Sequence, residues 1–179
     1  MKSTQGKIIF FIFLIIFTGS GLWAQENKDK DGLVSYSEGL FEGFVYYADK
    51  QKTALKSVKK KFASTLDSHS LGLEILASLI KGPQSGHLEA TWPKGTIINS
   101  FFITDEGKAY IDLSPEPGMI EKMDTQGELL AIYSIVNSLT LNISKIKMVK
   151  LLIRGKDALT LAGHIDLEYF YKTNMLMVK

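Results

Sequence analysis

The 179-residue chain contains no cysteine. It therefore forms no disulfide bonds and offers no cysteine for lipid attachment, so a packed core must supply its stability. The chain also lacks a marked excess of either charge, with 21 basic and 19 acidic residues. Residues 1–24 contain two of the lysines and none of the acids, which leaves 19 charges of each sign in the remainder. Because nucleic-acid-binding proteins usually carry a basic excess, we expect no nucleic-acid partner.

An unbroken apolar run occupies residues 8–17, after Lys2 and Lys7 and before a small, polar stretch that ends near Ala24. This order predicts a secretory signal peptide or an N-terminal membrane anchor over residues 1–24. The run is shorter than the roughly 20 residues that cross a bilayer, and Ala24 offers a cleavage site, so cleavage is favoured. If uncut, residues 8–24 could span the membrane and provide the protein's membrane contact. Either outcome makes the rest of the chain periplasmic or otherwise extracytoplasmic, secreted or anchored by one segment.

The exported part divides into three segments. Residues 25–40 begin with "QENKDKDG", whose polar and charged composition predicts a solvated tether. Residues 41–168 have the length and apolar content of a single globular domain. Residues 169–179, "YFYKTNMLMVK", are too apolar for a free tail, and we expect them to pack on the domain or on a partner.

Two kinds of apolar periodicity predict the fold. Strand-like patterns occur at 41–47, 54–63, 96–104, 108–114 and 146–155, and helical patterns at 67–82 and 128–142. Asp67, Ser68 or Ser70 can cap the first helix, and Gly82 with Pro83 ends it. The last strand does not alternate strictly, as expected of a strand buried on both faces or carrying a bulge. The order strand, strand, helix, strand, strand, helix, strand predicts an α+β fold in which two helices cover one face of a mixed sheet of about five strands.

Six lysines gather between residues 50 and 61, in and beside the first predicted hairpin. They suggest a binding patch or, alternatively, the solvated edge of the sheet, where lysine discourages edge-to-edge pairing. We favour the second interpretation because no arginine or interleaved aromatic pattern for reading phosphates or bases accompanies them.

The residues suited to metal or carboxylate chemistry lack the usual spacing. His69, His87 and His164 belong to separate elements, with no His-x-x-x-His pair and no cysteine, so we expect no metal site and no cofactor. Glu116 and Glu121 lie in a proline-bearing loop, where solvated acids are the usual case and a glycosidase pair is not indicated.

A hydrolase triad could be assembled from Ser114, His164 and either Asp112 or Asp166, but no Gly-x-Ser-x-Gly motif surrounds any serine. The stretch "GKDALTLAG" lacks the glycine spacing of a phosphate-binding loop, and Gly155 fits a tight turn after the last strand. We expect His164 to satisfy a backbone group or remain solvated, and Asp166 to cap the segment after it. The sequence therefore indicates no catalytic residue.

Four segments of the chain carry motifs of a known kind; they are "LASLIKGP" (76–83), "WPKGTIINSFFITDEGKAYIDLSPE" (92–116), "ELLAIYSIVNSLT" (128–140) and "VKLLIRGKDALTLAGHIDL" (149–167). Together they resemble the sporulation and spore germination domain known as GerMN. They match the family plan of a helix ending in Gly-Pro, a Pro-x-Gly-Thr turn into a hairpin, an "IVNTLT"-like helix and a strand ending in glycine. The stretches "KSVKKKFAS" and "LTLNISKIKMV" depart from that plan.

The resemblance implies a non-catalytic module of exported, membrane-tethered or wall-facing bacterial proteins that binds proteins or other ligands. Seven aromatic residues suit protein contacts or sugar stacking if exposed, although we favour the alternative that most of them fill the core. They are Phe44, Tyr46, Tyr47, Trp92, Tyr169, Phe170 and Tyr171.

We predict a non-catalytic binding module of the cell envelope, linked to spore or cell-wall processes, whose partner is an envelope protein or a cell-wall glycan. Two alternatives are a cell-wall or lipid hydrolase and a structural component that self-associates at the membrane through the lysine-rich hairpin.

Overall fold

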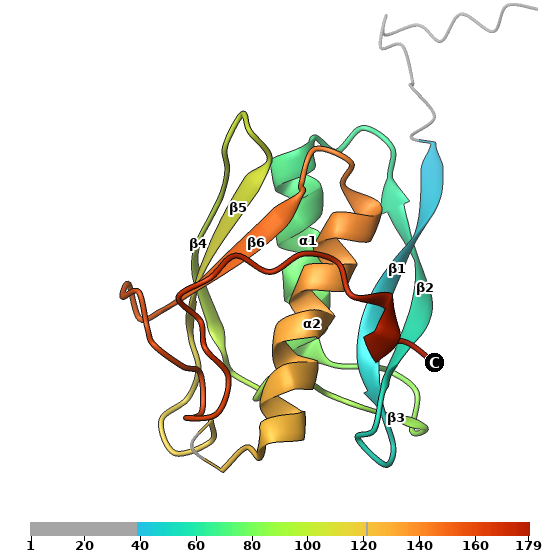
Figure 1. The fold of residues 1–179 in the computed structure, drawn as a ribbon. Helices are drawn as coiled ribbons and strands as arrows, with labels where there is room; N and C mark the ends of the chain where they lie inside the picture. The colour runs from blue at the N-terminus through green and yellow to red at the C-terminus, as the bar shows by residue number, and fades with distance from the viewer. Residues whose placement is uncertain (1–38, 121) are drawn as a thin grey trace, which may run out of the picture. The chain divides into compact units, whose positions relative to one another are not determined.

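Six strands and two α-helices follow one another in a computed structural model, which describes residues 39–120 and 122–179 (Figure 1). They are β1 (Leu40–Asp49), β2 (Leu55–Ala63), α1 (Ser68–Lys81), β3 (Leu88–Glu89), β4 (Ile97–Ile103), β5 (Lys108–Ser114), α2 (Thr125–Asn142) and β6 (Met148–Ile153). A short 3-10 turn, Met175–Met177, follows near the C-terminus. The α+β class and the predicted order of the longer elements are confirmed, and the two-residue β3 is an addition. The predicted signal peptide or anchor lies outside the described residues, as does almost all of the predicted tether.

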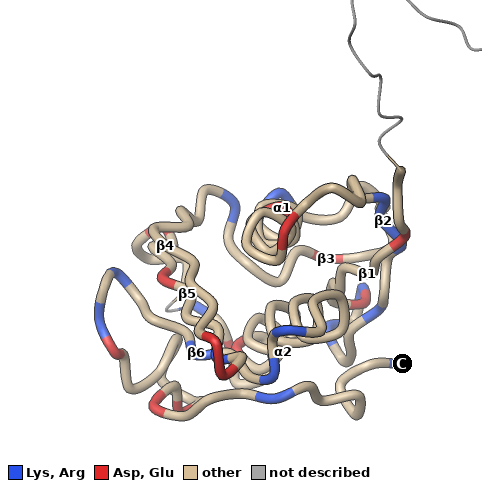
Figure 2. Tube along the Cα trace, turned by 90° about the horizontal axis from the view of Figure 1, so that it is seen from above, with Lys and Arg blue, Asp and Glu red and all other residues tan. Residues whose placement is uncertain are grey.

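The strands divide between two sheets, which corrects the expectation of a single sheet with both helices on one face. One sheet has the order β2-β1-β3 and is antiparallel. The other has the order β4-β5-β6, in which β4 pairs antiparallel and β6 parallel to β5. Each helix contacts strands of both sheets, and Figure 2 shows α1 and α2 between them. Two sheets form because both sides of the helix layer are apolar and each side needs its own cover.

Side-chain caps fix where the helices begin. Of the three residues that could cap α1, Asp67 does so, and its carboxylate accepts a hydrogen bond from the N–H of Ser70 at 2.7 Å. The helix ends as predicted at Gly82, whose φ of 83° few other residues adopt. Helix α2 begins at Thr125, three residues before the predicted start, because Asp124 accepts from the N–H of Gly127 at 2.7 Å.

The end of β6 is held by a buried carboxylate. Arg154 and Gly155 have φ values of 54° and 74° and form the tight turn predicted there. Asp112, on β5, accepts the N–H of Gly155 at 2.8 Å and an amide hydrogen of Asn99 at 3.0 Å. Asn99 lies at a register shift in β4, so one acid fixes both a bulge and a turn. The absence of strict alternation in β6 reflects burial on both faces, since Val149, Lys150 and Leu151 are all buried.

The C-terminal segment lies along the domain rather than apart from it. Tyr171 pairs with Val149 of β6, and Val178 forms a bridge to Leu55 of β2.

Within residues 39–120 and 122–179, neither helix has the length and apolar content needed to cross a membrane.

Candidate functional site

The structure gives the residues considered for a hydrolase triad other hydrogen-bond partners. The hydroxyl of Ser114 accepts a hydrogen bond from the Asn99 amide at 2.8 Å, and Asp112 is occupied by Asn99 and Gly155. His164 bonds instead to Glu128, which the sequence analysis did not single out. Asp166 accepts the N–H of Glu168 at 2.7 Å and so caps the following turn as expected.

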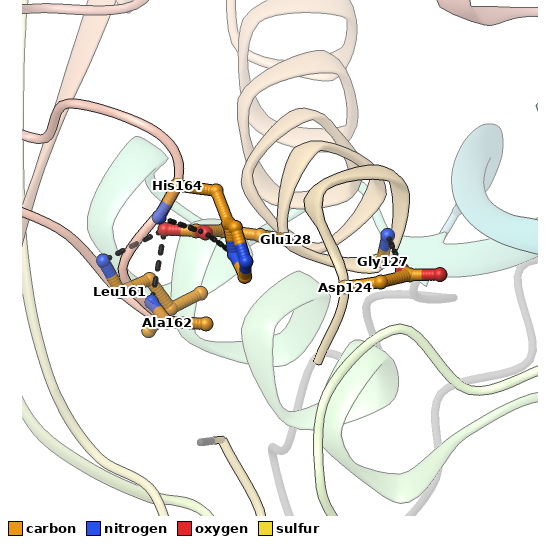
Figure 3. A network of polar contacts seen from close by, with 6 residues as sticks. All are labelled: Asp124, Gly127, Glu128, Leu161, Ala162 and His164. Atoms are coloured by element: carbon orange, nitrogen blue, oxygen red, sulfur yellow. Dashed lines mark hydrogen bonds and ion pairs between the residues drawn. The ribbon is translucent and has the colours of Figure 1, made fainter. Parts of the chain in front are cut away.

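Glu128 is the centre of a network of hydrogen bonds that includes His164 (Figure 3). It lies in the first turn of α2 and its exposed fraction is 0%. One carboxylate oxygen accepts the backbone N–H groups of Leu161 and Ala162, both at 2.9 Å. The other accepts the backbone N–H of His164 at 2.9 Å and lies 3.0 Å from Nδ1 of its ring. All the acceptor capacity of this acid is therefore used to hold the 161–164 loop against the helix.

The environment of Glu128 keeps it ionised. Burial raises the pKa of its carboxyl, but hydrogen bonds from the 162–165 backbone and the His164 ring lower it more, so the pKa lies below the usual 4.5. The placement in the first turn also suits a negative charge, because the helix dipole is positive there. The His164 side chain is 40% exposed, so this carboxylate–histidine pair has one buried and one solvated end.

Other polar side chains of α2 also form hydrogen bonds to the backbone of distant segments. Asn137 accepts from the N–H of Asn174 and donates to its carbonyl, both at 2.9 Å, which ties down the C-terminal segment. Ser138 accepts the N–H of Tyr46 at 3.0 Å, and Asn142 accepts the N–H of Phe44 at 2.9 Å. Glu128, Asn137 and Ser138 of "ELLAIYSIVNSLT" thus satisfy backbone groups of distant segments.

A second anchor holds the C-terminal segment on β6. Lys150 is buried, and its ammonium group donates to the carbonyl of Leu167 at 2.8 Å and pairs with Asp157 at 2.6 Å. The sequence patterns did not single out Glu128, Asn137 or Lys150 as residues that hold other segments in place. The available signal was a polar residue among apolar neighbours inside a predicted helix or strand.

A groove opens between β2 and the C-terminal end of α1. Its volume is about 480 Å³, and its lining includes the apolar Val45, Tyr47 and Val58. Tyr47 donates its hydroxyl hydrogen to the Ser78 carbonyl at 2.9 Å, and burial raises its pKa to about 12, so it stays neutral.

Lysines line the same groove; they are Lys59, Lys60 and Lys81. Lys60 donates to the Ser78 hydroxyl, and its ammonium lies 5.2 Å from the centre of the Phe62 ring. In the described residues, the salt bridges of the β2 lysines are limited to that between Lys59 and Glu42 at 2.8 Å. The groove therefore combines an apolar floor with a basic rim in which Lys59 is paired with an acid, while Lys60 and Lys81 form no salt bridge within the described residues. Such a groove suits an acidic ligand that also has apolar groups.

Comparison with family models identifies the domain. A model described as "Germane: Sporulation and spore germination" matches residues 44–159, which is more than half of the chain. The chain belongs to the Germane family. The match includes residues 44–49 of β1, all of β2, the groove and Glu128, and it confirms the resemblance drawn from the sequence motifs.

Solved structures share the fold of this Germane domain. A candidate lipoprotein from Clostridium perfringens is 26% identical, with a TM-score of 0.53 over 75% of this chain and 88% of that chain. The tandem GerMN domains of the sporulation protein GerM from Bacillus subtilis are 21% identical, with a TM-score of 0.54 over 74% of this chain and 46% of that chain. The first GerMN domain of the same protein is 22% identical, with a TM-score of 0.53 over 71% and 92%. The comparison with curated proteins gave no match.

The fold buries three of the seven aromatic residues that could have formed a sugar-stacking surface, and it leaves Phe44 37% exposed. Tyr46 and Tyr47 are buried in the core, and Trp92 is 2% exposed and donates its indole N–H to the Ala131 carbonyl at 2.9 Å. Tyr169 is 68% exposed, but Phe170 and Tyr171 are partly covered by Tyr110 and Tyr133. The core-filling interpretation holds for the three buried residues.

The histidines do not gather in the described part of the chain. His69 and His87 are exposed, and Nε2 of His69 lies 3.1 Å from the Phe101 carbonyl. Among residues 39–120 and 122–179, no cluster of three or more His, Asp or Glu side chains is placed to hold a metal ion. Glu116 is exposed in its loop, and Glu121 lies outside the described residues.

We expect His164→Ala to destabilise the Germane domain by only about 1 kcal/mol. The substitution removes only the hydrogen bond between the half-exposed imidazole and Glu128. Three backbone N–H groups still donate hydrogen bonds to the Glu128 carboxylate. Urea unfolding at neutral pH measures this loss. A loss several times larger would show that the imidazole, and not the backbone, is the main partner of Glu128.

Proposed function

We propose that this Germane domain is a non-catalytic binding module of an exported cell-envelope protein, and that its basic groove binds a partner protein. The groove itself is the observation that carries the proposal, because it is concave, has an apolar floor and has three lysines at its rim, of which Lys60 and Lys81 form no salt bridge within the described residues. The family description links the module to sporulation and spore germination.

The polar network near His164 supports a structural and not a catalytic role for that residue. A histidine with Nδ1 against a carboxylate resembles the base and orienting acid of a hydrolase. Here, however, the carboxylate of Glu128 also accepts three backbone N–H groups and is occupied with holding a loop. Ser114, the serine considered for a triad, accepts a hydrogen bond from Asn99. Among the described residues, no hydrogen bond joins this dyad to a serine hydroxyl, the nucleophile used in acyl transfer by such triads.

The groove favours a protein over a glycan as the partner. Sugar recognition relies on exposed aromatic faces, and Tyr47, the aromatic residue in the groove, is buried and committed to Ser78. Lysines beside an apolar floor complement acidic and aliphatic side chains instead.

An extracytoplasmic location agrees with the predicted export signal and with the similarity to a candidate lipoprotein. Because this chain has no cysteine, we propose that any anchoring uses the N-terminal apolar segment and not a lipid on cysteine.

Site-specific photocrosslinking in living cells tests the proposed binding face. A photoreactive amino acid at Gln84, on the groove, is expected to capture a defined envelope protein, whereas one at Glu106, an exposed residue of the β4–β5 turn, is not. Adducts that are absent at Gln84, or that are the same at both positions, would contradict the proposal.

The hydrolase alternative makes a different prediction. It requires turnover of a cell-wall or lipid substrate that disappears in His164→Ala. A hydrolysis screen in which the full chain shows no turnover would remove it.

A further inference from the structure

We propose that the partner adds an extended, acidic segment as an extra strand along the outer edge of β2, beside the basic groove. This inference rests on the proposed function and names the chemistry of the partner. Edge strands present unpaired backbone groups in a row, and addition of a strand from another protein is a common mode of peptide recognition.

The hydrogen-bonding pattern of the hairpin leaves one edge of β2 open. Ser64 donates to Gly39 at 2.8 Å, and Asp49 donates to Ala54 at 2.9 Å, at the two ends of the β1–β2 ladder. Because hydrogen-bonded pairs alternate in an antiparallel ladder, even-numbered residues of β2 bond to β1 and odd-numbered ones point outward. The outward backbone groups belong to Leu55, Ser57, Lys59, Lys61 and Ala63.

One of these outward backbone groups already bonds to the C-terminal end of the chain. The N–H of Lys179 donates to the carbonyl of Leu55 at 3.1 Å, and Val178 forms a parallel bridge with Leu55. In the described part of the chain, no backbone hydrogen bond from outside the hairpin reaches Ser57, Lys59 or Lys61. All three residues are exposed, so the edge is open for an added strand from Ser57 onward.

The charges along this edge select an acidic strand. Lys59 and Lys61 face one side of the sheet, and Lys56 and Lys60 face the other, so an added strand meets lysines on both faces. A second copy of β2 would place lysine beside lysine, which is unfavourable, whereas a strand rich in glutamate or aspartate would be attracted. Side chains on the groove side would also reach the apolar floor beside Val58. The best occupant is therefore acidic with interspersed aliphatic residues.

Synthetic peptides test both the charge and the strand pairing. The full chain, kept in detergent because its N-terminal run is apolar, is titrated with a short peptide that alternates glutamate and valine. Two matched probes accompany it, one with lysine in place of glutamate and one with alternate backbone amides N-methylated. We expect binding of the acidic peptide that weakens with salt, no measurable binding of the lysine peptide, and about a tenfold or greater loss on N-methylation.

A pair of substitutions at Ser57 tests the protein side. Ser57→Pro removes an outward N–H without breaking the β1–β2 ladder, and Ser57→Ala removes the same hydroxyl while keeping that N–H. We expect Ser57→Pro to weaken acidic-peptide binding about 3- to 10-fold, and Ser57→Ala to leave it unchanged. Unfolding curves verify that both variants are folded, and the N-methylated peptide gives the same test on the wild-type chain should the proline variant not fold.

The outcomes separate the two proposals. Equal binding of the normal and N-methylated acidic peptides, or equal binding of the lysine peptide, would overturn strand addition. Concentration-dependent self-association of the full chain that Ser57→Pro abolishes would assign the edge to a second copy and also overturn it. If no peptide binds while Gln84 still crosslinks an envelope protein, strand addition is wrong and the proposed function stands. If both fail, both are wrong.

Discussion

Glu128→Gln is expected to destabilise the Germane domain by about 3 to 5 kcal/mol, the largest loss we anticipate from any change of similar size. The amide has nearly the same shape, but only one of its two polar ends can accept a hydrogen bond. In either orientation its NH2 group faces donors, namely Leu161 and Ala162 on one side or His164 on the other. Two donor groups then confront each other in a site from which water is excluded.

Urea unfolding at neutral pH measures this loss, and Glu74→Gln is the matched control. Glu74 is an exposed glutamate of α1, so the same chemical change there should alter the free energy of unfolding by less than about 0.5 kcal/mol. A loss in Glu128→Gln no larger than in this control would show that the 161–164 loop is held by other contacts.

The stability difference between wild type and Glu128→Gln should depend on pH in a defined direction. Because the pKa of Glu128 is lower in the folded state than its usual 4.5, its stabilising contribution is complete above about pH 4.5 and is lost as the pH falls through the folded-state value. The difference in unfolding free energy between wild type and Glu128→Gln should therefore be constant near neutrality and narrow below about pH 4.5. A difference that is independent of pH would contradict the assignment of an ionised buried carboxylate.

Gly72→Ala is expected to destabilise the domain by about 2 kcal/mol, although alanine is the better helix former. Gly72 lies inside α1 and faces β4, where a Cβ atom would overlap the Phe101 ring, with Cζ only 2.5 Å away. Both residues are buried, so the ring has little room to move. Helix propensity favours alanine over glycine by about 1 kcal/mol, but overpacking of this kind costs about 1 to 3 kcal/mol or more.

Thermal or urea unfolding tests whether Gly72→Ala destabilises the domain. Gly86→Ala provides a control in which the added Cβ meets nothing within 4 Å. The control should be nearly neutral. A double variant with Phe101→Leu should lose less stability than the sum of the two single variants, because the smaller side chain removes the overlap. Additive losses, or a stabilised Gly72→Ala, would contradict the close approach of α1 to β4.

Several features followed from the sequence because short-range signals determine them. Asp67, one of the three candidate caps, and Gly82 mark the ends of α1, and the turn between β4 and β5 falls between the strand patterns predicted at 96–104 and 108–114. Caps, turns and apolar periodicity act over a few residues, so they can be read without knowing the rest of the fold. The motifs that indicated the Germane family are made of such signals.

The sequence by itself determined the α+β class, the order of the longer elements and the lack of disulfides. Tertiary structure decided that the strands form two sheets, that β6 runs parallel to β5, and that the basic groove lies between β2 and α1. It also decided the role of Glu128, whose partners lie 33 to 36 residues away in the chain. A local pattern shows that a side chain is polar or apolar, but only the packed fold brings a buried carboxylate to the backbone groups that need it.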